Sequence, residues 1–151
     1  MATTVKVIDT DQGYKRIGMN MKELNGRSIK IGIWGSAVQD GVAIVDYAIY
    51  NEFGTSRIPA RPFMQKTFDD KKDETMKFAE FLVGKMIDGG MTAQAALDKI
   101  GFQYQSFVRA TIRDAKNWAA PNADSTIAAK GSSSPLIDQG RMVNAVNFEV
   151  S

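Results

Sequence analysis

The sequence predicts an α+β fold, in which a small antiparallel sheet packs with two long helices. Two amphipathic segments, at about residues 62–88 and 92–116, repeat apolar side chains at helical spacing. A hairpin pattern at about residues 28–47 and a final stretch of alternating polarity at 147–150 predict the strands of the sheet. Long helices beside a short antiparallel sheet are the arrangement of α+β proteins.

Composition limits both the architecture and the chemistry. A chain of 151 residues is most simply one domain covering residues 1–151. The net charge is +2, and no segment holds the basic block typical of nucleic-acid-binding surfaces. The chain contains 0 Cys and 0 His, which excludes disulfides, thiolate metal sites and Ser-His-Asp catalysis. Carboxylate, lysine, serine and tyrosine side chains remain for chemistry, and because they form no recognisable site in the sequence we expect no catalytic residue, no cofactor and no metal. The lack of a signal pattern or long apolar run predicts a cytosol-like compartment.

The N-terminal part predicts one short helix. Residues 13–25 place apolar side chains at helical spacing, with Asp11 as a candidate N-cap and Asn25-Gly26 as the end. Before this helix, residues 5–8 alternate in polarity and indicate either a frayed end or an edge strand.

Two β-type runs follow. Residues 28–35 alternate strictly, and Asp40-Gly41 separates them from a second run at about 42–47. Because Asp-Gly between two such runs is a strong hairpin signal, we expect them to pair. From Asp46 the pattern becomes helical, and Gly54 is expected to end this short helix because it tolerates a positive φ.

The two long helices are separated by Gly89-Gly90, so they are expected to be antiparallel neighbours. Thr92 is the expected N-cap of the second helix. Acids and lysines between residues 69 and 74 indicate a solvated helix face in preference to a metal site. The first helix carries an apolar stripe predicted to face the core, made of Phe68, Met76, Ala79, Leu82, Val83 and Met86.

Residues 117–135 are rich in Asn, Asp, Ser, Pro and Gly, which predicts a flexible surface loop with one helical turn at 125–130. Loops of this length are uncommon in compact domains and are often functional. The end of the chain predicts a short helix at about 140–146 and then the strand at 147–150, which would join the hairpin in one sheet.

The stretch YAIYNEFGTSRIPARPFM, residues 47–64, matches no enzyme motif. Arg57 and Arg61 beside Glu52 could bind an anionic ligand, but the neighbouring aromatic residues favour a protein–protein contact. The alternative is intramolecular, with Arg61 paired to Glu52 so that it fixes the loop. The candidate interface residues of the whole chain are Glu52, Phe53, Arg57, Arg61, Phe63, Trp118 and Arg141.

Three stretches carry a resemblance to one family. Residues 51–64 (NEFGTSRIPARPFM) resemble a Glu-Phe-Gly-Thr … Pro-Ala-Arg-Pro-Phe motif. Residues 118–122 (WAAPN), followed by Thr126 and Lys130-Gly131, resemble a Trp-x-x-Pro … Thr … Lys pattern. Residues 135–142 (PLIDQGRM) are similar to Pro-Leu-Ile-Asp-Thr-Gly-Arg-Leu and depart from it at Gln139 and Met142. These are motifs of small tailed-phage neck proteins: tail-completion, head–tail joining or minor tail proteins, including the virion morphogenesis family.

The resemblance implies a structural virion protein of the neck and no enzymatic activity. It implies a homo-oligomeric ring, commonly sixfold, whose partners are the head-to-tail connector or adaptor and the tail tube or tail terminator. The protein would be made in the host bacterial cytoplasm and end in the virion, near channel DNA and away from membranes. The loops at 51–63 and 117–135 are the expected contact segments. Alternatives are a tail terminator that caps the tube, a DNA-contacting neck module and, in another class, a carboxylate-based hydrolase.

Overall fold

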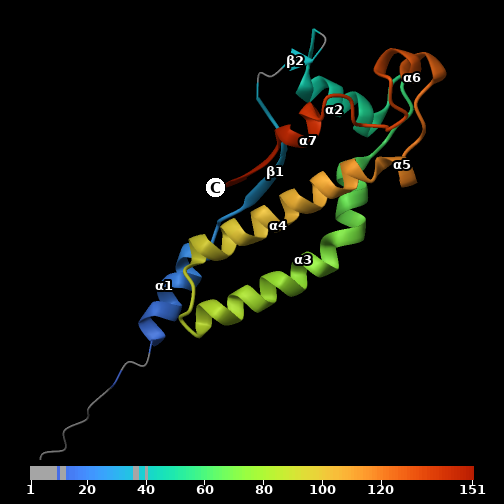
Figure 1. The fold of residues 1–151 in the computed structure, drawn as a ribbon. Helices are drawn as coiled ribbons and strands as arrows, with labels where there is room; N and C mark the ends of the chain where they lie inside the picture. Colours follow the sequence, from blue (N-terminus) through green and yellow to red (C-terminus); the bar gives the residue numbers. More distant parts are fainter. Residues whose placement is uncertain (1–9, 11–12, 36–37, 40) are drawn as a thin grey trace, which may run out of the picture.

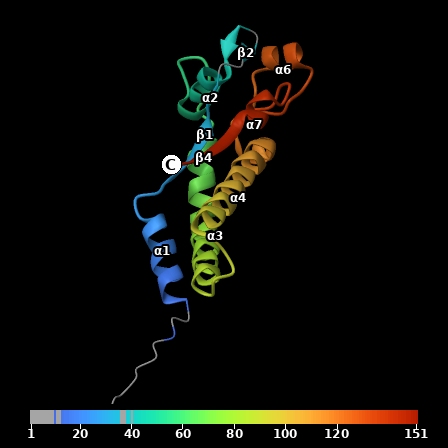
Figure 2. The same ribbon diagram turned by 90° about the vertical axis from the view of Figure 1, so that its left-hand side faces the viewer.

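Two long antiparallel helices, α3 (Phe63–Ile87) and α4 (Ala93–Arg113), form the axis of an elongated molecule (Figure 1). The computed structural model describes residue 10 and residues 13–35, 38–39 and 41–151. Helix α1 (Tyr14–Leu24) lies beside the end of the pair where α3 turns into α4, which we call the tip (Figures 1 and 2). The opposite end, called the loop end, gathers α2 (Ile44–Phe53), α5 (Ala115–Trp118), α6 (Asp124–Lys130) and α7 (Arg141–Ala145).

The α+β class predicted from the sequence is confirmed, but the pairing of strands differs. Strand β1 (Ile29–Ile33) pairs antiparallel with the C-terminal β4 (Val146–Val150), and both strands lie against α4. The expected pairing of residues 28–35 with 42–47 is therefore wrong. The hairpin is confined to β2 (Val38–Gln39) and β3 (Val42–Ala43), which form a separate two-stranded sheet.

The second β-type run is short because its apolar residues also fit a helix. Ile44 is 4% exposed and Ala48 is 7% exposed, and both face the core from the same side of α2. Burying this helical face stabilises α2 from Ile44 onward, so only two residues remain extended as β3. The local sequence pattern of this stretch suits a strand as well as a helix, and tertiary packing determines that it forms a helix.

Most helix boundaries follow local signals. Thr92 caps α4 as expected, since its Oγ1 accepts a hydrogen bond of 3.2 Å from the N–H of Ala95. Gly131, with φ 66°, ends α6 in the left-handed conformation that suits glycine. The expected cap Asp11 and the alternating residues 5–8 lie outside the described residues. None of the described helices is long and apolar enough to cross a membrane.

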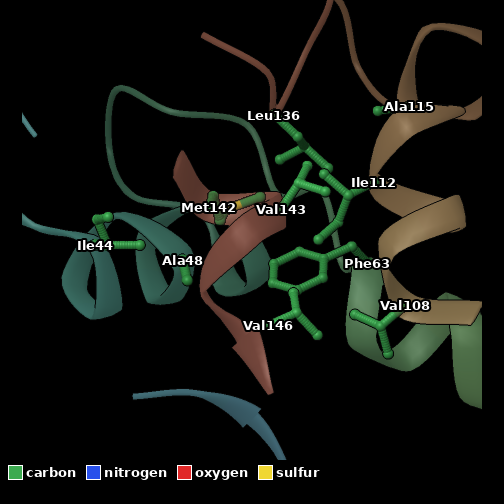
Figure 3. Close-up of a cluster of buried hydrophobic side chains, with 10 residues drawn as sticks. All are labelled: Ile44, Ala48, Phe63, Val108, Ile112, Ala115, Leu136, Met142, Val143 and Val146. Atoms are coloured by element: carbon green, nitrogen blue, oxygen red, sulfur yellow. The ribbon is translucent and has the colours of Figure 1, made fainter. Parts of the chain in front are cut away.

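The main hydrophobic core lies at the loop end, where Phe63 is surrounded by side chains from α2, α4, α7 and β4 (Figure 3). Phe63 is 2% exposed, and burial of a side chain of this size contributes about 1.5–3 kcal/mol. A smaller cluster at the tip joins α3 to α4 through Leu82, Met86, Ala93 and Ala96. The loop-end core consists of Ile44, Ala48, Phe63, Val108, Ile112, Ala115, Leu136, Met142, Val143 and Val146.

Between the two clusters, the predicted apolar stripe of α3 is only partly correct. Leu82 and Met86 are buried, whereas Phe68 is 53% exposed and Met76 is 61% exposed. Helical periodicity gives the direction of an apolar face but not the extent of its cover. Here α3 packs on α4 and, near the tip, on α1, so part of the stripe stays open to solvent.

Candidate functional site

The first two stretches that carry the family resemblance line one small pocket of about 150 Å³ at the loop end, and the third lies beside it. The third stretch affects the pocket through the carboxylate of Asp138. Its negative charge acts to raise the pKa of Lys130 and the pKa of Tyr47. Segments far apart in the sequence are therefore neighbours in the fold. The pocket is lined by Tyr47, Asn51, Arg57, Ile58, Pro59, Arg61, Asn122, Ala123, Thr126 and Lys130.

Arg61 connects these segments. Its side chain is 6% exposed and donates four hydrogen bonds: from Nε to the carbonyl of Ala120 (2.7 Å), from Nη2 to the carbonyl of Pro121 (2.9 Å) and to Oδ1 of Asn122 (3.2 Å), and from Nη1 to Oδ1 of Asn51 (3.0 Å). One guanidinium thereby ties α2 to residues 120–122. The intramolecular role weighed for Arg61 is the one observed, although its partners differ from those expected.

Glu52, the partner expected for Arg61, instead caps a helix. Its Oε2 accepts a hydrogen bond of 2.9 Å from the N–H of Met64, and its Oε1 accepts one of 3.0 Å from the N–H of Gln65. The first N–H groups of a helix have no partner within the helix, and a negative charge is favourable there. A carboxylate of α2 therefore stabilises the start of α3 and fixes the angle between the two helices.

The chain between these helices makes a tight turn. The N–H of Thr55 donates to the carbonyl of Ile58 (2.8 Å), and Thr55 Oγ1 accepts from the N–H of Arg57 (3.2 Å) and of Ile58 (3.0 Å). Gly54 adopts φ 76°, and a Cβ there would lie 2.9 Å from the backbone nitrogen of Ala60. Glycine is thus required both for its backbone angle and for the close approach of the chain. This turn directs Arg61 inward and leaves Arg57 at the surface.

Three cationic side chains line the pocket: Arg57, Arg61 and Lys130. Burial lowers the pKa of Arg61, and the nearby Tyr47 acts in the opposite direction. Burial also lowers the pKa of Lys130; the charge of Asp138 opposes this effect and that of Arg61 adds to it. Among the residues that the structure describes, neither Arg61 nor Lys130 forms an ion pair with a carboxylate. Within the described part of the chain, the positive charge of this pocket is therefore only partly compensated.

The other predicted contact residues divide between surface and interior. Phe53 is 77% exposed, and Arg57 and Arg141 are also exposed, so these side chains can reach a partner. Phe63 and Arg61, two further interface candidates, are buried in this structure, Phe63 in the core and Arg61 against residues 120–122. Trp118, a half-buried residue, packs against the core and donates from Nε1 to the carbonyl of Thr111 (2.9 Å).

An apolar groove lined by α3, α4 and β4 was not predicted from the sequence. The groove has a volume of about 670 Å³, and its aromatic lining consists of Phe78, Phe102, Phe107 and Phe148. Phe102 is 63% exposed, and Phe81 on α3 is 57% exposed. Phe78 and Phe81 both fall outside the apolar stripe predicted for the first long helix, and this was the signal in the sequence.

The described residues include no group of three or more His, Cys, Asp or Glu side chains that could hold a metal ion. The arrangement at the loop end offers positive charge and hydrogen-bond donors in a small space. No protein-family model, no curated protein and no solved structure matches this chain.

Proposed function

We propose that the chain is a structural protein of the tailed-phage neck, a tail-completion or head–tail joining component that forms a ring between head connector and tail tube. The observation that supports this proposal is that two of the resembling stretches line one pocket, while the carboxylate of Asp138 in the third acts on the pKa of Lys130 in that pocket. Arg61 alone bridges positions 59 to 61 residues apart, between the first stretch and the second. Motifs that meet in space are expected if the resemblance reflects one shared structural unit and not three chance matches.

Exposed apolar side chains give the proposed ring its contact surfaces. Large exposed apolar patches are uncommon on monomeric proteins and often mark sites of association. A ring needs two different patches, one on each side of the subunit. The aromatic groove around Phe102 is lined by α3, α4 and β4, whereas Phe53 lies at the end of α2, so the two belong to different elements.

The oligomeric state of the purified protein tests this proposal. We expect multimers by light scattering and ring-shaped particles by negative-stain electron microscopy, with their formation weakened in Phe102→Ser. Gly84→Ser is a matched control, because Gly84 is an exposed position of α3 with open space around it. A protein that remains monomeric, alone and with connector proteins, would contradict the proposal.

A phage that lacks this protein would distinguish a head–tail joining protein from a tail terminator. A joining protein is expected to leave filled heads and finished tails that do not attach, whereas a tail terminator would leave tails of irregular length. The surface variant Arg57→Glu should reduce joining while the chain stays folded, since its side chain is exposed. Salt-dependent DNA binding by the isolated protein would favour the DNA-contacting module instead.

A further inference from the structure

We propose that the pocket at the loop end binds one small oxyanion, a carboxylate or phosphate group, between Arg61, Lys130 and Arg57. The inference does not rest on the proposed function, since it concerns the isolated chain. The pocket has a volume of about 150 Å³. It is well below the roughly 300–1,000 Å³ of pockets for drug-sized ligands, so it suits a single anionic group and not a nucleotide.

The first argument is the charge of Arg61. Charged groups in protein interiors are normally paired with an opposite charge. All four acceptors of Arg61 are neutral, two of them backbone carbonyls and two amide oxygens. The guanidinium has five N–H donors, so one N–H of Nη1 remains after these four bonds. A buried cation with a remaining donor beside a pocket is a site for an anion.

The second argument is that further donors converge on the same space. The ammonium of Lys130 donates one bond, to the carbonyl of Ser134 (3.2 Å), and has three N–H donors. The side chain of Arg57 lies at the exposed rim. Burial raises the pKa of Tyr47, so its hydroxyl keeps the proton at neutral pH. Among the described residues, the carboxylate of Asp138 acts on Lys130 while three cationic side chains line the pocket, so the charge there is net positive.

The third argument is preorganisation. The four hydrogen bonds of Arg61 hold its guanidinium in place before any ligand arrives. The turn at residues 54–58 is fixed by its own hydrogen bonds, and it positions Arg57 and Ile58 at the pocket. Binding to such a site orders few groups, so even a small anion can be retained.

Thermal unfolding of the whole chain tests the proposal at neutral pH, with acetate or inorganic phosphate replacing chloride at constant ionic strength. A ligand that binds only the native state raises the unfolding temperature in a saturable way. We expect saturation at millimolar concentrations, with binding about tenfold weaker in Lys130→Gln, the effect of one charge-assisted hydrogen bond. The matched control Lys77→Gln, an exposed α3 lysine outside the pocket, should bind like the parent protein.

Arg57→Gln provides a second pocket variant, should Lys130→Gln fold poorly, since the Arg57 side chain is exposed. Preferential binding of acetate would identify an acidic side chain of a partner protein as the source of the anion. Preferential binding of phosphate would identify a free or nucleic-acid phosphate. The absence of saturable stabilisation at tens of millimolar, or equal stabilisation in both pocket variants and the Lys77→Gln control, would overturn the proposal.

Discussion

Replacing Arg61 with Met tests whether this side chain holds the loop end together. Methionine keeps much of the length and volume of the side chain but removes all of its donors. Four acceptors then lose their partner: the carbonyls of Ala120 and Pro121 and the amide oxygens of Asn51 and Asn122. The substitution also removes a buried charge, and this part of the change is favourable.

The net effect follows from these opposing contributions. Hydrogen bonds to charged groups contribute about 1.5–3 kcal/mol each, so four of them set an upper limit of roughly 6–12 kcal/mol. The variant no longer has to desolvate a guanidinium on folding, which offsets several kcal/mol of this loss in the free energy of unfolding. Residues 120–122 are exposed or half-buried, so water can reach part of the abandoned carbonyls. We expect a loss of about 3–5 kcal/mol in the free energy of unfolding, a large part of the roughly 5–15 kcal/mol of a typical domain.

Urea unfolding followed by circular dichroism measures this loss, and native-state hydrogen exchange locates it. We expect faster exchange in α6, for example at the N–H of Ile127, which is bonded to the carbonyl of Ala123 (3.0 Å), while the centre of α4 stays protected. Arg57→Met is the matched control and should change stability by less than about 0.5 kcal/mol, because this side chain is exposed. If Arg61→Met lost less than about 1 kcal/mol, or left exchange in α6 unchanged, the reasoning would be refuted.

Three further outcomes are expected. Gly101→Ala places a Cβ 2.3 Å from Cδ2 of Phe148, so thermal unfolding should show a loss of about 1–3 kcal/mol, whereas Gly84→Ala, with open space around it, should gain about 0.5–1 kcal/mol. Glu52→Gln removes the charge at the start of α3 and should cost about 1 kcal/mol in urea unfolding, a result that an unchanged midpoint would contradict. Because burial raises the pKa of Tyr47, the native state holds this proton more tightly than the unfolded chain does. That contribution to stability is complete below about pH 10 and is lost as the pH rises through the native pKa. Tyr47→Phe should therefore flatten the alkaline part of a curve of stability against pH. The pH dependence that remains is due to groups such as Tyr104, whose pKa is also raised by burial.

The elements that could be predicted from the sequence are those specified by nearby residues. Helices α3 and α4 follow from apolar periodicity and from the stop at Gly89-Gly90, and α6 and α7 from short helical runs beside glycine. The C-terminal strand was expected to join the 28–47 segment in a sheet, and β4 does pair with β1 through contacts such as Ile29 with Val150. What could not be predicted is that this distant pairing stands in place of the one expected between residues 28–35 and 42–47. An Asp-Gly signal identifies a turn, but it does not show that the strand before it has a better partner elsewhere.

The candidate site was predictable only in part, for a related reason. The sequence indicated that the charges at residues 52, 57 and 61 belong together, but it offered only side chains as their partners. In the structure, Glu52 accepts from two backbone N–H groups, and Arg61 donates to two backbone carbonyls. Every residue has a backbone carbonyl, and every residue except proline has a backbone N–H. The residue types alone therefore do not indicate which of these groups will bind a side chain. The pocket itself depends on how the 51–64 and 118–130 segments cross in space.

The intramolecular hydrogen bonds of each pocket residue determine whether its substitution can test function separately from stability. Glu52 and Arg61 both serve backbone groups of their own chain, so replacing either one would change stability before it changed any contact with a partner. Arg57 and Lys130 are different, since the first is exposed and the second makes one hydrogen bond, to Ser134. Lost activity in an Arg61 variant would therefore be ambiguous between unfolding and lost recognition. Lost activity in Arg57 or Lys130 variants of unchanged stability would instead identify the charge of the pocket as the functional property.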